Sequence, residues 1–402
     1  MARIACVLSV LACLLAPAAA QAAGDAATKR ILRQQMAHAG PFSGAYVLDL
    51  ETGQALYGED SDIERMPASV EKLYTSSTAL LRFGADGTLT TAASADAAPD
   101  ELGIVAGNLY LRGGGDPSFD AKAAGRLADR LIAETGLTEV QGRVIGDESA
   151  FDGRRGPPSE GFRTSIWVGP LSALTFNRGF TGRRRPLFQT SPPLFAARAF
   201  TTALRKRGVA VRRKARAGVA PPAVVQLAIV GSPTIARLIT AMNVPSDNFI
   251  AETLIKSLGA TFGGRGTTAV GAQVVRSTVS ELGVRTRAID GSGLSRSNRT
   301  SPRAVVSLLT AMAESDVSAP FTASLPVAGR TGTLRYRMRG TAARDACRAK
   351  TGTLSNVSAL AGYCKTRDGG RVAFAFLMNG VYPGSARIHQ DRMAAALAGY
   401  TG

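Results

Sequence analysis

Strand-like segments occur at both ends of the chain, and this feature limits the fold most. Near the N-terminus, GAYVLDLETGQALYGED alternates apolar and polar residues about a Glu-Thr-Gly turn. This predicts a hairpin with strands near 44–50 and 54–58. Near the C-terminus, ACRAKTGTL, VSALAGYCKT and GRVAFAFLMNGV predict three more strands, followed by the helical segment SARIHQDRMAAALAG. We therefore expect one sheet assembled from both ends of the chain, with helices packed on it.

The middle of the chain has a different pattern of predicted secondary structure. From Thr88 to about Pro186, short strand-like pieces alternate with the helical segment AKAAGRLADRLIAETG. We interpret residues 88–186 as an inserted small α+β domain with its own core. Residues 24–87 and 187–402 are then the two parts of a discontinuous main domain, of the α/β class and the α+β type.

The first residues predict export. MARIACVLSVLACLLAPAAAQAAG has a basic start at Arg3, an apolar stretch and an Ala-rich end with A-x-A sites, which is typical of a secretory signal at residues 1–23. Cys13 leaves open an acylated lipoprotein cysteine. Export places the mature protein in the periplasm, at the cell wall or outside the cell.

The charge of the chain suggests a polyanionic partner. The formal charge is +18, and loss of Arg3 with the signal leaves 47 basic and 30 acidic residues, or +17. Outside the cytoplasm this favours association with an anionic wall or membrane surface, while a general composition bias stays open. Aromatic residues are not interleaved with the arginine runs, so nucleic acid is not the expected partner.

Few side chains are available for catalysis by a histidine or a metal. His38 and His389 are the only histidines, and both fall in predicted helices. With two cysteines left in the mature chain, they make a poor metal-ligand set, and no metal site is predicted. The glycine-rich segments GGGDPS and GGRGTT match neither a P-loop nor a G-x-G-x-x-G fingerprint. We expect no cofactor.

A serine with a lysine as its base remains. ASVEKL places Ser69 three residues before Lys72, so both lie on one face of a helix start, where the helix dipole stabilises negative charge on the serine oxygen. Lys72 acts as a base only when neutral, and both burial and a nearby cation lower a lysine pKa. By itself, an S-x-x-K match is close to chance in a serine-rich chain.

Two further motifs follow in order. VPSDNFIAE carries Ser246-Asp247-Asn248 at a helix start, and AKTG carries Lys350-Thr351-Gly352 on a strand. S-x-x-K, S-D-N and K-T-G in this order are the set of penicillin-binding proteins and class A β-lactamases. In that set Ser69 is the nucleophile, and Ser246 with Lys350 relays a proton. Asn248 binds a substrate amide, Lys350 and Thr351 bind a carboxylate, and the backbone N–H groups of Ser69 and Thr353 form an oxyanion hole.

The chain resembles a family at this point: the class C low-molecular-mass penicillin-binding proteins, which are D-alanyl-D-alanine carboxypeptidases and endopeptidases. Beside the three motifs, the resemblance rests on GNLYLRGGGDPSF, GPLSALTFNRG, DGSGLSRSNRTSP and LPVAGRTGTLRYRMRGTAARDACRAKTGTLSNVSALAGY. It implies a penicillin-binding transpeptidase-like fold with a five-stranded antiparallel sheet flanked by helices. It also implies peptidoglycan stem peptides as substrate and β-lactam antibiotics as inhibitors. The second insert of larger members is expected to be missing here.

The tetrapeptide TGTL occurs twice, and the resemblance separates the copies. It implies that the second copy, with Lys350, belongs to the site and that the first, after Arg330, is a structural lead-in. Arg330 remains an alternative carboxylate ligand. The resemblance also implies that Asp116 and Arg296 contact the far end of the stem peptide. A turn aspartate and a surface arginine are the alternatives.

Two rival functions stay open. A serine β-lactamase shares the short motifs, although the longer segments argue against it. An inactive basic wall-binding protein on the same fold is the other rival, and the intact Ser69, Lys72 and Lys350 argue against that.

Cys347 and Cys364 are the cysteines of the mature chain. If ACRAKTGTL and VSALAGYCKT form a hairpin with its turn centred between Ser355 and Asn356, these two cysteines face each other across the strands. Export permits a disulfide between them. The alternative is a pair of buried, reduced cysteines.

Overall fold

The computed structural model describes residues 24, 26–182 and 187–401. The predicted signal peptide lies outside these residues. Five antiparallel strands form the main sheet in the order β11-β12-β13-β1-β2, so strands from both ends of the chain join in one sheet as expected. These strands are β1 (Phe42–Asp49), β2 (Ala55–Glu59), β11 (Cys347–Leu354), β12 (Val357–Lys365) and β13 (Arg371–Asn379).

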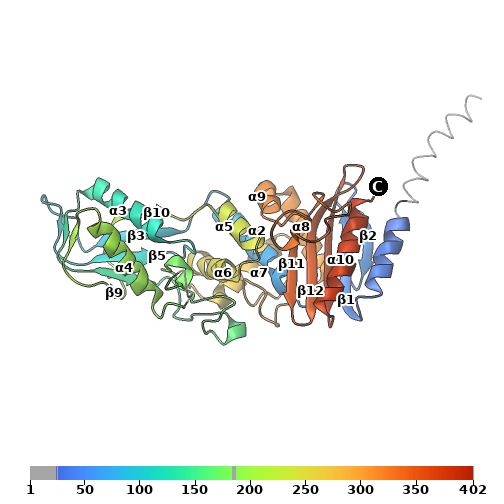
Figure 1. Cartoon of the computed structure of the whole chain (residues 1–402), viewed down its shortest axis with the longest axis horizontal. Coiled ribbons are helices and arrows are strands. Elements are labelled where there is room, and N and C mark those ends of the chain that lie inside the picture. Colours follow the sequence, from blue (N-terminus) through green and yellow to red (C-terminus); the bar gives the residue numbers. More distant parts are fainter. Residues whose placement is uncertain (1–23, 25, 183–186, 402) are drawn as a thin grey trace, which may run out of the picture.

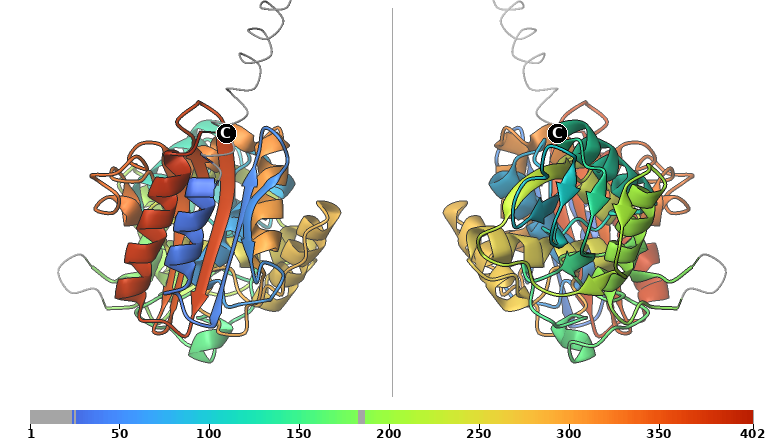
Figure 2. Two further views of the ribbon diagram at one scale, coloured as in Figure 1. Left: turned by 90° about the vertical axis from the view of Figure 1, so that its right-hand side faces the viewer. Right: turned by 90° about the vertical axis from the view of Figure 1, so that its left-hand side faces the viewer.

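Both faces of the main sheet are buried, and alternate residues of each strand supply them. Along β13, Phe374 and Phe376 pack into one apolar cluster and Ala373 and Ala375 into the other. The large side chains meet α10 (Pro383–Ala398) and the helix over residues 26–36, which lie side by side on the outer face (Figure 2). The small ones let the inner helices approach closely.

The inner layer contains the helices that carry much of the site. In the described part of the chain they are α2 (Lys72–Phe83), α5 (Ile235–Asn243), α6 (Asn248–Phe262), α7 (Thr268–Glu281), α8 (Pro302–Glu314) and α9 (Ser318–Ala323). Figure 1 shows α2, α5, α6 and α7 between the main sheet and the inserted part, which occupy opposite ends of the elongated molecule. The site therefore lies where the main sheet, the inner helices and the inserted part meet. None of the helices in the described residues is long and apolar enough to cross a membrane.

The inserted part is larger than the sequence predicts. Its mixed sheet has the order β10-β3-β5-β7-β9, and a small parallel sheet, β4-β6-β8, lies beside it. Two helices cover it, α3 (Ala121–Thr135) and α4 (Pro192–Arg205). The strands are β3 (Thr90–Ala95), β4 (Ile104–Val105), β5 (Leu109–Gly113), β6 (Glu139–Val140), β7 (Val144–Asp147), β8 (Ala210–Val211), β9 (Arg216–Ala217) and β10 (Val225–Gly231).

The predicted boundary at residue 187 is therefore wrong. The insert runs from β3 to β10, because β10 pairs with β3 and returns the chain to the main domain. Helix α4 buries Ala197, Phe200 and Leu204 in the core of the insert and not against the main sheet. The apolar spacing of α4 predicts a half-buried helix correctly, but it does not say which core the helix joins.

The register predicted for the cysteine hairpin is confirmed. Cys347 pairs with Cys364 across β11 and β12, their Cα atoms are 4.0 Å apart, and a disulfide joins them. Both residues are fully buried under α10. The bond ties the strand that carries Lys350 to its neighbour.

We expect the exported protein to show no free thiol when it is unfolded and alkylated without reductant. Reduction should then lower its stability by at most roughly 3 kcal/mol, since the bridge closes a short loop. Mass analysis of the alkylated protein and thermal unfolding with and without reductant measure the two effects. Two alkylated thiols in unreduced protein would contradict the bridge.

Candidate active site

The site is built at the junction of η1 (Ala68–Glu71) and α2. Ser69 lies in this 3₁₀ turn and Lys72 begins the α-helix, so the three-residue spacing brings the two side chains together. The Lys72 Nζ atom lies 3.0 Å from Ser69 Oγ. Ala68, just before the serine, has a φ of +47°, which is rare for a residue other than glycine. The backbone is thus held in an unusual conformation at the serine, as is common at functional sites.

Lys72 is completely buried, and all its contacts are oxygens. Besides Ser69 Oγ, Nζ donates to Asn248 Oδ1 at 2.7 Å and to the Ser292 carbonyl at 2.6 Å. These last two groups can only accept. A neutral Lys72 keeps its two hydrogens on them and leaves its lone pair facing the serine hydroxyl. Burial lowers the pKa of Lys72 to about 8, against the opposing effect of nearby carboxyl groups.

The S-D-N and K-T-G motifs meet on the other side of the serine. Lys350 Nζ lies 2.8 Å from Ser246 Oγ, and Lys350 is fully buried. Burial, followed by the charge of Lys72, holds the pKa of Lys350 well below its usual range. Ser246 has a φ of +64°, a second strained non-glycine residue. Two serines, each beside a buried lysine, therefore face one space.

Two glycines allow the strand and a loop to approach the serine. A Cβ atom on Gly352 would lie 2.6 Å from the Pro67 carbonyl oxygen and 3.1 Å from Ser69 N. A Cβ on Gly293 would lie 1.9 Å from the Ala68 carbonyl oxygen, and its φ is +85°. Only glycine fits at both positions. The close approach of β11 is what an oxyanion hole made of Ser69 and Thr353 N–H groups requires.

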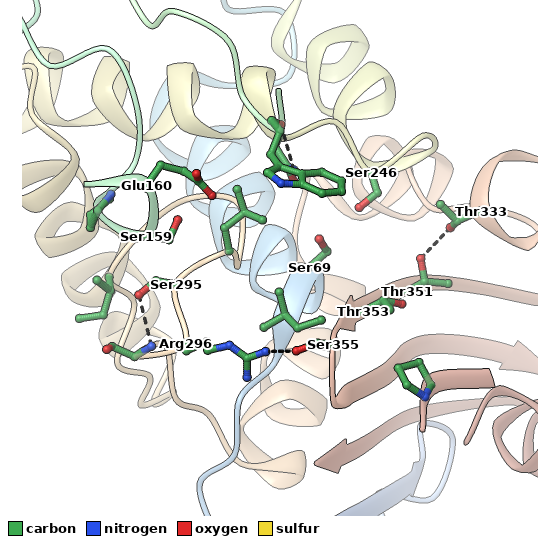
Figure 3. A pocket seen from close by; sticks show the side chains of 18 of the residues that line it. Ser69, Ser159, Glu160, Ser246, Ser295, Arg296, Thr333, Thr351, Thr353 and Ser355 are labelled. Carbon is green, nitrogen blue, oxygen red and sulfur yellow. Dashed lines mark hydrogen bonds between the residues drawn. The ribbon is translucent and has the colours of Figure 1, made fainter. Parts of the chain in front are cut away.

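These residues line a cavity of about 1270 Å³. Figure 3 shows Ser69 at its centre, Thr351 and Thr353 on the β11 side, and Ser159 and Glu160 on the opposite wall. Of the predicted site residues, the cavity is lined by Ser69, Ser246, Asn248, Arg296, Thr351 and Thr353. Lys72 and Lys350 lie behind the serines that they contact.

The two residues expected at the far end of a peptide behave differently. Arg296 lines the cavity and donates to the Ser355 hydroxyl and to Asn356 Oδ1, at the turn after β11. Asp116 does not line it: the carboxylate is buried and accepts from the N–H and hydroxyl of Ser118. Asp116 thus closes a turn in the insert, which was the alternative reading of GGDP.

The first TGTL segment has a structural role, and one of its residues also lines the cavity. Arg330 forms an ion pair with Asp345 and does not line the cavity. Thr333, in η4 (Gly332–Leu334), accepts a hydrogen bond from Thr351 Oγ1 at 2.8 Å. Its N–H donates to the Val244 carbonyl, two residues before Ser246. This copy thus braces the S-D-N segment against the K-T-G strand.

The inserted part supplies groups that the motifs did not reveal. Trp167 lines the cavity and is 62% exposed, and its carbonyl accepts from Asn248 Nδ2 at 3.2 Å. Arg178 forms an ion pair with Asp247. The insert therefore positions the S-D-N motif from outside. No sequence pattern marked these contacts, although the segment GPLSALTFNRG contains Arg178.

Comparison with known proteins gives consistent results. Residues 26–185 and 186–400 match the D-Ala-D-Ala carboxypeptidase 3 (S13) family. A D-alanyl-D-alanine carboxypeptidase of Actinomadura sp. strain R39 is 32% identical, over 90% of this chain and 82% of its own. Penicillin-binding protein 4 of Haemophilus influenzae has the same fold, with a TM-score of 0.77, 20% identity, and coverage of 90% of this chain and 97% of its own. The same protein complexed with a β-lactam gives a TM-score of 0.74, 20% identity, and coverage of 90% and 96%.

Proposed function

Because the chain belongs to the D-Ala-D-Ala carboxypeptidase 3 (S13) family, we propose that it cleaves the terminal D-Ala-D-Ala bond of peptidoglycan stem peptides through an acyl-enzyme on Ser69. Membership makes the protein a serine-type carboxypeptidase and a class C low-molecular-mass penicillin-binding protein. One observation carries the mechanism: Lys72 Nζ lies 3.0 Å from Ser69 Oγ, with carbonyl acceptors for its two other hydrogens.

In the first step Ser69 Oγ attacks the carbonyl carbon of the penultimate D-alanine while Lys72 takes the hydroxyl proton. The N–H groups of Ser69 and Thr353 stabilise the oxyanion. The C–N bond then breaks, and the leaving amine of D-alanine takes a proton through Ser246, which Lys350 polarises. Water attacks the ester and releases the shortened peptide. The complete reaction consumes one water molecule and needs no cofactor.

The substrate is held from two sides. The carboxylate of the terminal D-alanine would bind at Thr351 and Thr353, close to the buried Lys350, and Asn248 would hold the peptide amide. Arg296 suits the far end of the stem peptide, since it borders the cavity at the end of β11. The cavity exceeds the size of a typical small-molecule site, so we extend the proposal to cleavage of D-Ala–diaminopimelate cross-links.

The location of the enzyme is part of the proposal. Its substrate lies outside the cytoplasm, and residues 1–23 have the composition of a secretory signal. The formal charge of +17 after removal of that segment would favour residence at an anionic wall or membrane surface.

We expect the mature protein to release one D-alanine from a peptide ending in D-Ala-D-Ala and none from the same peptide ending in D-Ala-L-Ala. Benzylpenicillin should inhibit this release and add one covalent mass that is lost slowly. Quantification of D-alanine and intact-mass analysis measure both effects. Rapid catalytic consumption of the penicillin would indicate a β-lactamase instead. Wall binding with neither reaction would indicate an inactive wall-binding protein.

A further inference from the structure

Three acidic side chains are buried next to Lys72 and have no place in the steps above. Glu71, Glu252 and Asp290 have no exposed surface. They come from η1, from α6 and from the loop between α7 and α8. All the hydrogen-bonded contacts of Lys72 are with uncharged oxygens, so the carboxyl groups that act on its charge are more distant ones, first Asp290 and Glu252.

Hydrogen bonding distinguishes the three acids. Asp290 Oδ1 accepts from Gly293 N–H and Asn298 Nδ2, each at 2.8 Å, and Oδ2 accepts from Ser295 N–H at 2.6 Å. Burial raises the pKa of Asp290, but these three donors oppose the rise, and they make Asp290 the acid of the cluster that best supports a negative charge. This residue also folds the loop that borders the cavity.

Glu252 and Glu71 are less well satisfied. Glu252 Oε1 accepts from Gly291 N–H and from Ser292 N–H, at 3.1 and 2.8 Å, but Oε2 has no hydrogen-bond partner. Neither carboxyl oxygen of Glu71 has one. A buried carboxylate without donors is very costly, and a carboxyl group in that situation keeps its proton. Burial, then repulsion by Asp290, raises the pKa of Glu71 well above its ordinary value and that of Glu252 to about 8.

A short path connects Glu252 to the lysine. The carboxyl group binds the N–H of Ser292, and the carbonyl of that same residue accepts the hydrogen bond from Lys72. Because both groups are buried and one residue separates them, the charge of one changes the proton affinity of the other. Among the described residues, no three His, Cys, Asp or Glu side chains are arranged to hold a metal ion.

We propose that Glu252, packed beside the carboxylate of Asp290 and a protonated Glu71, is a positioning residue that controls how readily Lys72 gives up its proton and so sets the pH range in which Ser69 is activated. The proposal rests on the function proposed above. As pH rises, Lys72 loses its proton while Glu252 begins to ionise. The new negative charge favours the protonated lysine, so the loss of the lysine proton is spread over a wide pH range.

Other charged groups lie near Lys72, and they must be left unchanged when the glutamates are replaced. Asp247, at the start of α6, is paired with Arg178, and Lys350 projects from β11. None of these is altered by a change at Glu252 or Glu71. A change in the pH profile of such a variant therefore reports on the acid cluster.

The experiment measures the rate constant of acylation by benzylpenicillin from about pH 5 to about pH 10. It compares the parent with Glu252→Gln, Glu71→Gln and the double variant. Glutamine keeps the size and the Oε1 acceptor but cannot ionise. Glu252→Gln removes the negative charge that the parent gains as Glu252 ionises, so the rise of the rate with pH should become steeper and reach its plateau at a pH lower by about one unit. Glu71→Gln alone should follow the parent, because it replaces a protonated carboxyl group by another uncharged group. Well below the midpoint all the variants should be acylated at the parent rate.

Asp147→Asn is the matched control, since Asp147 is an equally buried carboxyl group in the insert, and its profile should coincide with that of the parent. Thermal unfolding checks each variant. A Glu252→Gln variant that keeps the parent profile, or that shifts it to higher pH, would overturn the proposal. If Glu71→Gln does not fold, Glu252→Gln alone decides. A parent protein that is never acylated at any pH would overturn the proposed function itself.

Discussion

Replacing Ser69 by alanine should abolish the covalent adduct with benzylpenicillin and reduce D-alanine release by at least about four orders of magnitude. The serine Oγ is the nucleophile in the proposed mechanism, and its neighbour Lys72 has no other hydroxyl within hydrogen-bonding distance in the described structure. The change removes one oxygen atom, so the fold should persist. Intact-mass analysis after incubation with the drug measures the adduct, and peptide mapping locates it.

A second serine of the same cavity is the control. Ser159 lies on the opposite wall, in η2 (Pro158–Glu160), with no lysine beside it among the hydrogen bonds of the described residues. Ser159→Ala should therefore still carry one adduct. Labelling of the Ser69 variant equal to that of the parent would remove Ser69 as the nucleophile.

The second large effect concerns the two lysines. Lys72→Ala removes the proton acceptor of Ser69, and Lys350→Ala removes the group that polarises Ser246 and attracts the substrate carboxylate. Each change should slow acylation by about two to four orders of magnitude. Single-turnover acylation kinetics measure the loss, and thermal unfolding shows whether the vacated space destabilises the fold.

Arg330→Ala tests the choice between the two TGTL copies. Its guanidinium pairs with Asp345 at the surface, so acylation should change by no more than about threefold. An arginine variant as impaired as Lys350→Ala would mean that the first copy binds the carboxylate.

Local patterns predicted the elements of the main sheet well. The turn at Ser355 and Asn356 determines the pairing of β11 with β12, because a hairpin register follows from its turn. The helix start at Ser69 and Lys72 follows from spacing alone. The boundary of the insert could not be predicted in this way. It depends on β10 returning to pair with β3, more than a hundred residues away, and short apolar strands do not specify their partner.

The site was predictable where motif residues touch each other, and not where other segments support them. Lys72 with Ser69 and Lys350 with Ser246 are contacts between motif residues. The Trp167 carbonyl on Asn248 and the Thr333 hydroxyl on Thr351 join segments without a shared pattern. Glu252 and Asp290 look like ordinary helix and loop acids in the sequence. Only tertiary structure shows that they are buried near the same lysine.

The strand order of the main sheet has a consequence for the time course of folding. The central strand is β13, which pairs with β12 on one side and with β1 on the other. The first strand to be synthesised, β1, therefore cannot pair with β13 until nearly the whole chain has been made. Contacts so distant along the chain form slowly. The residues from β3 to β10 leave the ribosome long before β13 and have a core of their own. We expect this segment to become protected from proteases first, while Ser69 and Lys72 come together with Lys350 only when the C-terminal strands arrive.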